Sequence, residues 1–442
     1  MNKTSEDIKK QSSDRKHTVC ERNRSKKMDH AASWMLRLLL LSLFWTCSAS
    51  TASAGDMQEQ AAAPVKELPV VRITTDGEEM PTCQLIYPPE EDMPGVTITN
   101  AEYVKGHVTV SGIPGAPANA PMKIKVRGNS SVAGRKKSYK IKLDNAAELL
   151  GRDGSKADRE WLLLNNGDSL KTWLGFLISE QAGMEWTPEV VFVDVEFNDE
   201  PQGIYLLAES VKVSPARVNI GEKGALFEDD TYWWNENGNY FQTAAQDHTM
   251  GYTWKYPEDV PPTDPSIQAL QARMQRLENC IMGNGRNLSK EIDLNSWADW
   301  LLVRDILGHG DPAGSNLYFY TDDIGSGKIK MGPLWDFDAA FEVDENWSLQ
   351  HIAPTLPFAR LMSIPAFRKT YIARWRAIHP TLEQTVNERL DLLISTQGEA
   401  LERSRRRNSD LWGKRPSLAE ETAQIRNDLH KQLAWMTAQL GN

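Results

Sequence analysis

The amino-acid sequence predicts an α+β protein with a β-rich amino-terminal part and a helical carboxyl-terminal part. Residues 122–127 and 138–143 alternate apolar and polar side chains, as half-buried strands do. From about residue 265 onward the chain is expected to be mostly helical, over 265–282, 293–307, 364–380, 382–404 and 416–440. Strands that precede helices in the chain favour segregated elements over an alternating parallel sheet. The 442 residues, 40% of them hydrophobic, suffice for a large core.

The first 54 residues have the order of segments that is typical of a secretory signal peptide. A basic, polar stretch precedes an apolar run over 34–47, and small residues then lead to Ala52-Ser53-Ala54. Arg37 interrupts the apolar run, which is also short for a membrane span. We therefore expect cleavage near Ala54 and a secreted, periplasmic or cell-surface location. An uncleaved anchor, or a lipid anchor on Cys47, is the alternative.

Removal of this segment makes the protein more acidic. Residues 1–54 hold 10 of the 50 Lys and Arg residues and 5 of the 60 Asp and Glu residues, so the remainder has a net charge of −15. Such a surface is unsuited to non-specific nucleic-acid binding. The remainder contains two cysteines, Cys83 and Cys280, which are too few for a disulfide scaffold and lack the spacing of zinc ligands. One bridge or none is expected.

The first candidate site is a loop that contains Asp311 and Asn316. These residues are five positions apart in a Gly-, Pro- and Ser-containing segment, directly after a predicted helix and before the predicted strand 316–320. Protein kinases place a catalytic Asp and a metal-binding Asn at this separation. The alternative is a helix-exit loop in which Asp and Asn serve as turn formers.

The second candidate site is the segment Trp335-Asp336-Phe337-Asp338. It lies 20 residues beyond Asn316, after a predicted hairpin of 316–320 and 328–331. Two carboxylates at positions i and i+2 suit a hard cation such as Mg²⁺ or Mn²⁺. Together with the preceding loop, the segment predicts a metal-dependent phosphoryl-transfer site. The alternative is an acidic hairpin end that Trp335 and Phe337 anchor by packing.

The third candidate site is a basic region in the predicted strands. Eight basic residues fall within 20 positions of an otherwise acidic protein: Lys123, Lys125, Arg127, Arg135, Lys136, Lys137, Lys140 and Lys142. The turn 128–131 adds backbone N–H groups beside them, and such a region would attract the phosphates of a nucleotide. Because charged runs often form solvated strand faces, that alternative stays open for most individual lysines.

A set of motifs in this order resembles the CotH kinase family of spore-coat, atypical secreted protein kinases. The motifs are Arg127-Gly-Asn-Ser-Ser, Lys136-Lys-Ser-Tyr-Lys-Ile-Lys-Leu143, Gly203-Ile-Tyr-Leu-Leu-Ala-Glu209, Lys255-Tyr-Pro257, Asp311 to Asn316-Leu-Tyr-Phe-Tyr, and Trp335-Asp-Phe-Asp338. The resemblance implies a divergent two-lobed protein-kinase-like fold, ATP and a divalent metal, and transfer of phosphate to Ser or Thr of a protein substrate.

The resemblance also implies roles for individual residues. Asp311 would be the catalytic residue, Asn316 and Asp336 would bind metal, and Asp338 is a possible additional ligand. Four residues would contact the nucleotide: Arg127, Lys137, Lys142 and Glu209. Position matching favours Lys137 as the phosphate-pairing lysine and the strand pattern favours Lys142, so the choice stays open. Glu209 has a structural role as its alternative.

The resulting division of the chain has five parts: a signal peptide at 1–54, a linker at 55–67, a small β-rich region at 68–118, a CotH kinase-like domain at 119–404 and a helical extension at 405–442. The sequence leaves two alternative functions. A catalytically idle surface binding or assembly module is suggested by the lack of an obvious ATP supply outside the cell. The chain also departs from the family pattern at Lys171-Thr172 and after Asp338, which bears on its activity. A carbohydrate-active protein is suggested by the 15 tryptophans, but no spacing identifies the facing carboxylate pair that glycosidases need.

Overall fold

The computed structural model describes residues 64–87, 97–99, 101–236, 238–244, 251–309, 316–342 and 358–441. The chain divides at Pro64, and the described residues after it belong to the unit Val65–Asn442. The predicted signal peptide, most of the predicted linker and Asp311 lie outside the described residues. The unit Val65–Asn442 is mixed α+β with a β-rich amino-terminal part and a helical carboxyl-terminal part, as the sequence predicts.

The amino-terminal strands form a closed barrel in the order β1-β4-β5-β6-β7-β9-β8. Their bounds are Val70–Thr75 for β1, Val104–Ser111 for β4, Ala120–Arg127 for β5, Ser138–Ala147 for β6, Asp158–Leu164 for β7, Val190–Phe197 for β8 and Glu200–Glu209 for β9. Alternate residues such as Ile73, Ile124 and Ile141 fill the interior. A parallel pairing of β1 with β8 closes the barrel, so no strand edge is left open.

The barrel includes strands from both sides of residue 118. β4 pairs antiparallel with β5 in a register that sets Val104 opposite Ile124. The other strands of the region 68–118, β2 at Gln84–Ile86 and β3 at Thr97–Thr99, form a two-stranded sheet of their own. The β-rich region and the basic strands therefore share one barrel.

A second, five-stranded sheet follows in the order β11-β12-β10-β13-β14. Its bounds are Ala225–Asp230 for β10, Tyr240–Gln242 for β11, Gly251–Tyr256 for β12, Leu317–Thr321 for β13 and Lys330–Met331 for β14. The predicted hairpin is confirmed, because β13 and β14 pair antiparallel. Phe227 of β10 stacks on Phe319 of β13 at 5.2 Å between ring centroids, which anchors the centre of this sheet in the main core.

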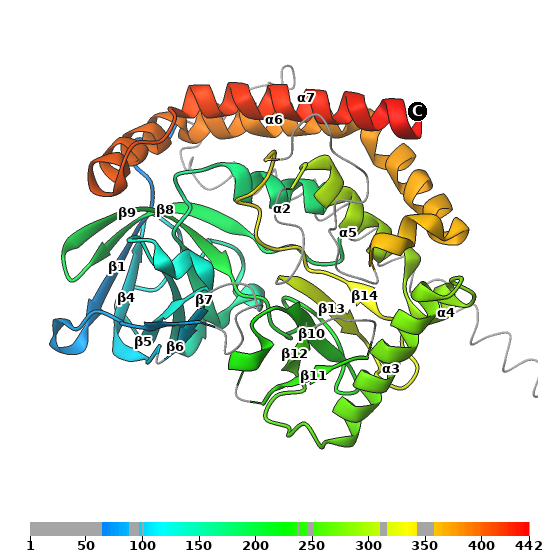
Figure 1. The fold of residues 1–442 in the computed structure, drawn as a ribbon. Coiled ribbons are helices and arrows are strands. Elements are labelled where there is room, and N and C mark those ends of the chain that lie inside the picture. The colour runs from blue at the N-terminus through cyan, green and yellow to red at the C-terminus, as the bar shows by residue number, and fades with distance from the viewer. Residues whose placement is uncertain are drawn as a thin grey trace, which may run out of the picture. The chain divides into compact units, whose positions relative to one another are not determined.

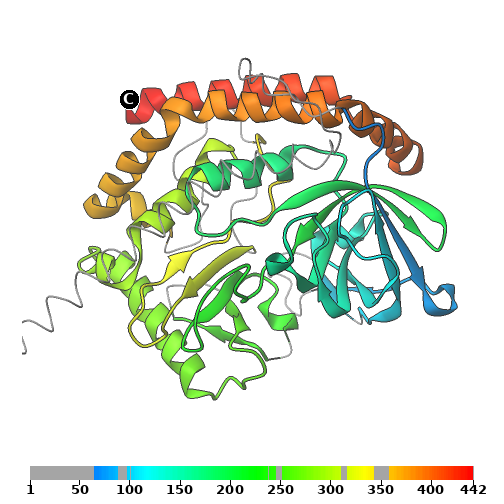
Figure 2. The same ribbon diagram turned by 180° about the vertical axis from the view of Figure 1, so that it is seen from behind.

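Six helices complete this unit in the described part of the chain: α2 Lys171–Gln181, α3 Pro265–Met282, α4 Leu288–Glu291, α5 Leu294–Ile306, α6 Pro365–Trp412 and α7 Leu418–Leu440. Short 3₁₀ turns occur at Asp76–Glu78, Ser130–Ala133, Gly154–Lys156, Trp233–Asn235 and Phe358–Ser363. Figures 1 and 2 show α6 and α7 side by side along one edge of the unit, above both the barrel and α2. None of the described helices has the length and apolar character of a membrane span.

The prediction of separate helices over 364–380 and 382–404 is wrong, because α6 is one helix that contains Pro380. Proline removes one backbone donor and disfavours a continuous helix. Buried side chains on both sides of it, Trp375 and Leu382 among them, pack into the main core and hold the helix together. Cys83 and Cys280 are both free thiols.

Candidate active site

The two metal-binding candidates, Asn316 and Asp336, meet beside the five-stranded sheet. Asn316 directly precedes β13, and Asp336 follows β14, so the hairpin returns the chain to the same place. The Asn316 side-chain amide donates a hydrogen bond to Asp336 Oδ2 at 3.0 Å. Both residues have positive φ angles, 64° and 59°, which non-glycine residues rarely adopt. Residues 20 positions apart therefore form one half-buried pair.

The backbone around Asp336 is held by buried side chains at the end of α5. Arg304, 3% exposed, donates from Nη1 to the Asp336 carbonyl at 3.1 Å and from Nη2 to the Trp335 carbonyl at 2.8 Å. His309, 2% exposed, places Nε2 at 2.9 Å from the same Asp336 carbonyl. Phe337 is fully buried and packs edge-on against Phe176 of α2. These contacts restrict where the Asp336 carboxylate can lie.

His309 is a site residue that the sequence prediction missed. It stands two positions before Asp311, so the loop reads His-x-Asp-x-x-x-x-Asn. The catalytic loop of protein kinases has a His in this position relative to its Asp and Asn. The spacing of His309 relative to Asp311 and Asn316 was therefore enough to identify it from the sequence. Asp311 itself lies in the segment 310–315, outside the described residues.

Glu228 of β10 is the second site residue that the sequence prediction missed. Its Oε1 accepts a hydrogen bond from the backbone N–H of Asn316 at 2.9 Å, and its Oε2 lies 3.5 Å from Lys255 Nζ on β12. Burial lowers the pKa of Lys255, but the surrounding carboxylates, Glu228 first, outweigh burial and raise that pKa above its usual value. Lys255 is therefore a cation at neutral pH.

Arg127 is the predicted nucleotide-binding residue that the barrel brings to this site. It ends β5, and its guanidinium lies 5.8 Å from the centre of the Trp335 ring, a cation–π contact. This contact joins the basic strands to the segment that contains Asp336.

The other nucleotide-binding candidates make contacts within the barrel and its loops. Lys137 Nζ donates to the carbonyls of Val132 and Gly134. Lys142 Nζ lies 3.3 Å from Glu160 Oε1, and Glu209, 1% exposed, is 3.0 Å from Arg152. Lys140 also pairs with Glu160, and these lysines outweigh burial and lower the pKa of Glu160 to about 2.

Asp338 is exposed, and its backbone is tied to α2. Lys171 Nζ donates to the Asp338 carbonyl at 3.0 Å and lies 3.4 Å from Glu342 Oε1. Lys171, one of the two residues that depart from the family pattern, therefore supports the segment that contains Asp336.

The Asn316–Asp336 pair fits a magnesium-type site with few protein ligands. Within the residues that the structure describes, no group of three or more His, Cys, Asp or Glu side chains is placed to hold a metal ion. Mg²⁺, however, usually keeps several waters and binds through one or two carboxylates plus the phosphates of a substrate. The carboxylate of Asp336 and the amide oxygen of Asn316 are oxygen ligands of that type, and the hydrogen bond from the Asn316 amide nitrogen to Asp336 holds the two side chains together.

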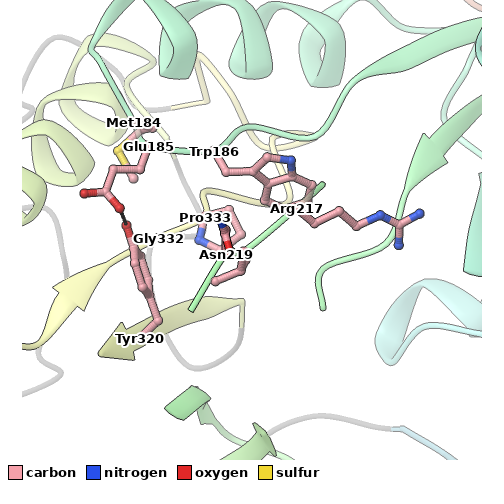
Figure 3. A pocket seen from close by; sticks show the side chains of 9 residues that line it. Met184, Glu185, Trp186, Arg217, Asn219, Tyr320, Gly332 and Pro333 are labelled. Carbon is pink, nitrogen blue, oxygen red and sulfur yellow. Dashed lines mark hydrogen bonds between the residues drawn. The ribbon is translucent and has the colours of Figure 1, made fainter. Parts of the chain in front are cut away.

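A separate pocket opens beside the β13–β14 hairpin, shown in Figure 3. The side chains of Glu185 and Tyr320 meet on one side of it, where the Tyr320 hydroxyl donates to Glu185 Oε2 at 2.8 Å. Trp186 and Pro333 contribute apolar walls, whereas the guanidinium of Arg217 points away from it. The pocket borders the segment that leads to Trp335, but Asn316 and Asp336 are not among its lining residues.

Comparison with known protein families shows which family the chain resembles. The family model described as CotH kinase protein matches residues 124–436, from β5 to near the end of α7. A search of the curated proteins found no match.

Proposed function

The chain belongs to the CotH kinase family, and from this premise we propose that it transfers the γ-phosphoryl group of ATP to a Ser or Thr hydroxyl of a protein. The reaction would depend on Mg²⁺ or Mn²⁺, and the two lobes would be the barrel and the helical part with the five-stranded sheet. Family membership by itself indicates a kinase-like function. Substrate, metal and export belong to the proposal.

The observation that supports this proposal most is the contact between Asn316 and Asp336. Protein kinases hold their metal with a catalytic-loop Asn and a separate Asp that begins the segment after a hairpin. In this chain the same residue types come within 3.0 Å, and His309 contacts the backbone carbonyl of that Asp. Bound ATP and its metal would supply the phosphoryl group and neutralise the charge that develops in transfer.

The residues of the chain would have distinct tasks. Asn316 and Asp336 would bind the metal through their side-chain oxygens, and Asp338 would be an additional ligand. Arg127 would attract the nucleotide phosphates from the barrel side, and Lys137, Lys142 and Glu209 stay predictions as nucleotide contacts. Asp311 would accept the proton of the acceptor hydroxyl, so that the hydroxyl oxygen can bond to the γ-phosphorus while the bond to the β-phosphate oxygen breaks and ADP leaves.

The location is part of the proposal. The order of basic, apolar and small residues in 1–54 supports export with cleavage near Ala54. The acceptor would then be an exported or surface protein, with membrane contact only through the export signal or a lipid anchor.

The proposal is tested with [γ-³²P]ATP and the purified protein, with Mg²⁺ or Mn²⁺ and with chelator. Metal-dependent label transfer is expected, to an added protein or to the chain itself. Asp311→Asn should reduce transfer sharply without weakening nucleotide binding, and Asp336→Ala should weaken metal-dependent nucleotide binding. Asp391→Asn is the control, because Asp391 is an exposed residue of α6 that pairs with Arg426. No transfer by the wild type would favour the non-catalytic binding module.

A further inference from the structure

We propose that Glu228 is a positioning residue for Asn316, acting through the hydrogen bond that it accepts from the Asn316 backbone. The inference rests on the proposed function, because Asn316 matters as a metal ligand. It adds a residue from β10, a strand that contains none of the candidates from the sequence, and it names the contact through which that residue acts.

The first step is the conformation of Asn316. Its φ of 64° lies in the left-handed region, which asparagine adopts more readily than most L-residues do but which is uncommon outside glycine. A backbone in such a conformation persists when its surroundings determine it. The Glu228 carboxylate fixes the Asn316 backbone from the side of the sheet. It accepts a hydrogen bond from the Asn316 N–H at 2.9 Å, and a hydrogen bond to a carboxylate is strong. The side-chain amide is then directed to Asp336 at 3.0 Å.

The second step is the placement of Glu228 itself. In the β10–β13 pairing Glu228 stands opposite Tyr318, two residues after Asn316, so the sheet register brings the carboxylate to the start of β13. Glu228 is 6% exposed, and a buried carboxylate needs partners. The Tyr318 hydroxyl hydrogen bonds to it, and Lys255 Nζ lies 3.5 Å away. Together with the Asn316 N–H, these groups hold the carboxylate in place.

The third step is the charge balance. Lys255 lies 4.0 Å from Glu236 as well as 3.5 Å from Glu228, and Asp230 is a further carboxylate close enough to affect its pKa. Lys255 thus compensates a carboxylate that would otherwise be buried with only neutral donors. The contact with Lys255 thus holds the Glu228 carboxylate beside the Asn316 N–H, from which it accepts the hydrogen bond.

Three forms of the protein test the inference: wild type, Glu228→Leu and Glu228→Gln. Leucine removes the acceptor at similar volume, whereas glutamine retains an oxygen for the Asn316 N–H. Mn²⁺ binding is measured by electron paramagnetic resonance in the presence of a non-hydrolysable ATP analogue. Loss of a group that orients a metal ligand typically weakens metal binding about 10- to 100-fold, and that loss is expected for Glu228→Leu. Glu228→Gln should lie between it and the wild type.

The matched control is Glu278→Leu. Glu278 is a fully buried carboxylate of α3 that accepts hydrogen bonds from Thr243 at 2.8 Å and Tyr252 at 2.7 Å. Its replacement should lower the melting temperature while the Mn²⁺ affinity stays at the wild-type value. Comparison of the two leucine variants therefore separates loss of stability from loss of positioning.

The outcomes distinguish this inference from the proposed function. Wild-type protein that shows no nucleotide-dependent Mn²⁺ binding would refute the proposed function itself. If the wild type binds Mn²⁺ and a folded Glu228→Leu variant binds it equally well, Glu228 does not position Asn316. If that variant does not fold, amide hydrogen exchange in the wild type decides, because a bonded Asn316 N–H should be protected. Exchange at the rate of an open amide would overturn the inference.

Discussion

Gly175 of α2 allows a sharp test of how the fold supports the site. A Cβ atom at this position would lie 2.1 Å from Cγ of Phe337 and within 2.5 Å of both Cδ atoms of that ring. Ordinary contacts of a methyl group begin near 3.4 Å, so alanine would overlap the ring by more than 1 Å. Phe337 is fully buried and directly follows Asp336, so the ring has little room to move and its movement would displace the site.

Two opposing effects set the change in the free energy of unfolding that Gly175→Ala should cause. Replacement of a helical glycine by alanine usually stabilises by about 0.5–1 kcal/mol. Overpacking of a filled core usually costs about 1–3 kcal/mol. Because the overlap here is with a buried aromatic ring, the second effect should win. The free energy of unfolding should fall by about 1–2 kcal/mol, with weaker metal-dependent nucleotide binding.

The measurement is denaturant unfolding of Gly175→Ala beside Gly398→Ala. Gly398 lies inside α6, and the nearest atom to its added Cβ is a side-chain carbon of Ile394 at 3.4 Å. This control should therefore be neutral or stabilised by up to about 1 kcal/mol. Phe337→Leu should recover part of the loss when it is combined with Gly175→Ala, since the smaller side chain relieves the overlap. Equal stabilisation by both alanine variants would refute the reasoning.

Two further predictions concern stability. Burial raises the pKa of Asp299 to about 6 although Arg374 lies 2.6 Å away. The protonated Asp299 side chain therefore adds to the stability of the folded protein below pH 4, and this contribution is lost as the pH rises to about 6. Asp299→Asn should make the free energy of unfolding depend less on pH between pH 4 and 6, whereas Asp391→Asn, at an exposed residue, should keep the wild-type dependence. An unchanged pH dependence in Asp299→Asn would contradict the raised pKa of Asp299. Ser417 and Glu420 form a capping box at the start of α7, so Ser417→Ala should cost about 1 kcal/mol in the same assay, and wild-type stability would argue against the cap.

Local patterns sufficed for several elements. The predicted helix 265–282 matches α3, because Asp264 caps its first turn by accepting from the Ser266 N–H and the apolar residues behind it face the core. The strands at 122–127 and 138–143 are the cores of β5 and β6, since alternation reports a half-buried surface directly. By contrast, β10 is absent from the prediction. All six of its residues are buried, including three acids. Glu228 and Asp230 have partners outside β10, Asn316 and Thr253, which only the tertiary structure brings to them.

In the candidate site, too, local spacing predicts some features and tertiary contacts decide the others. The spacing of Asp311, Asn316 and Asp336 was readable along the chain, and His309 could have been read with it. The sequence left open which basic residue reaches the site. Lys137 bonds to carbonyls of its own loop and Lys142 pairs with Glu160, because strand register decides which charges become neighbours.

Local patterns in the sequence are enough to predict the α+β class, the order of the motifs and the residue types that a kinase-like site would need. Those properties depend on periodicity and spacing, which are local. The tertiary structure alone decided the closure of the barrel by β1 and β8, the continuity of α6 through Pro380 and the contact of Glu228 with Asn316. Each joins residues far apart in the chain or opposes a local preference. Their energy comes from burial and pairing that no single segment contains.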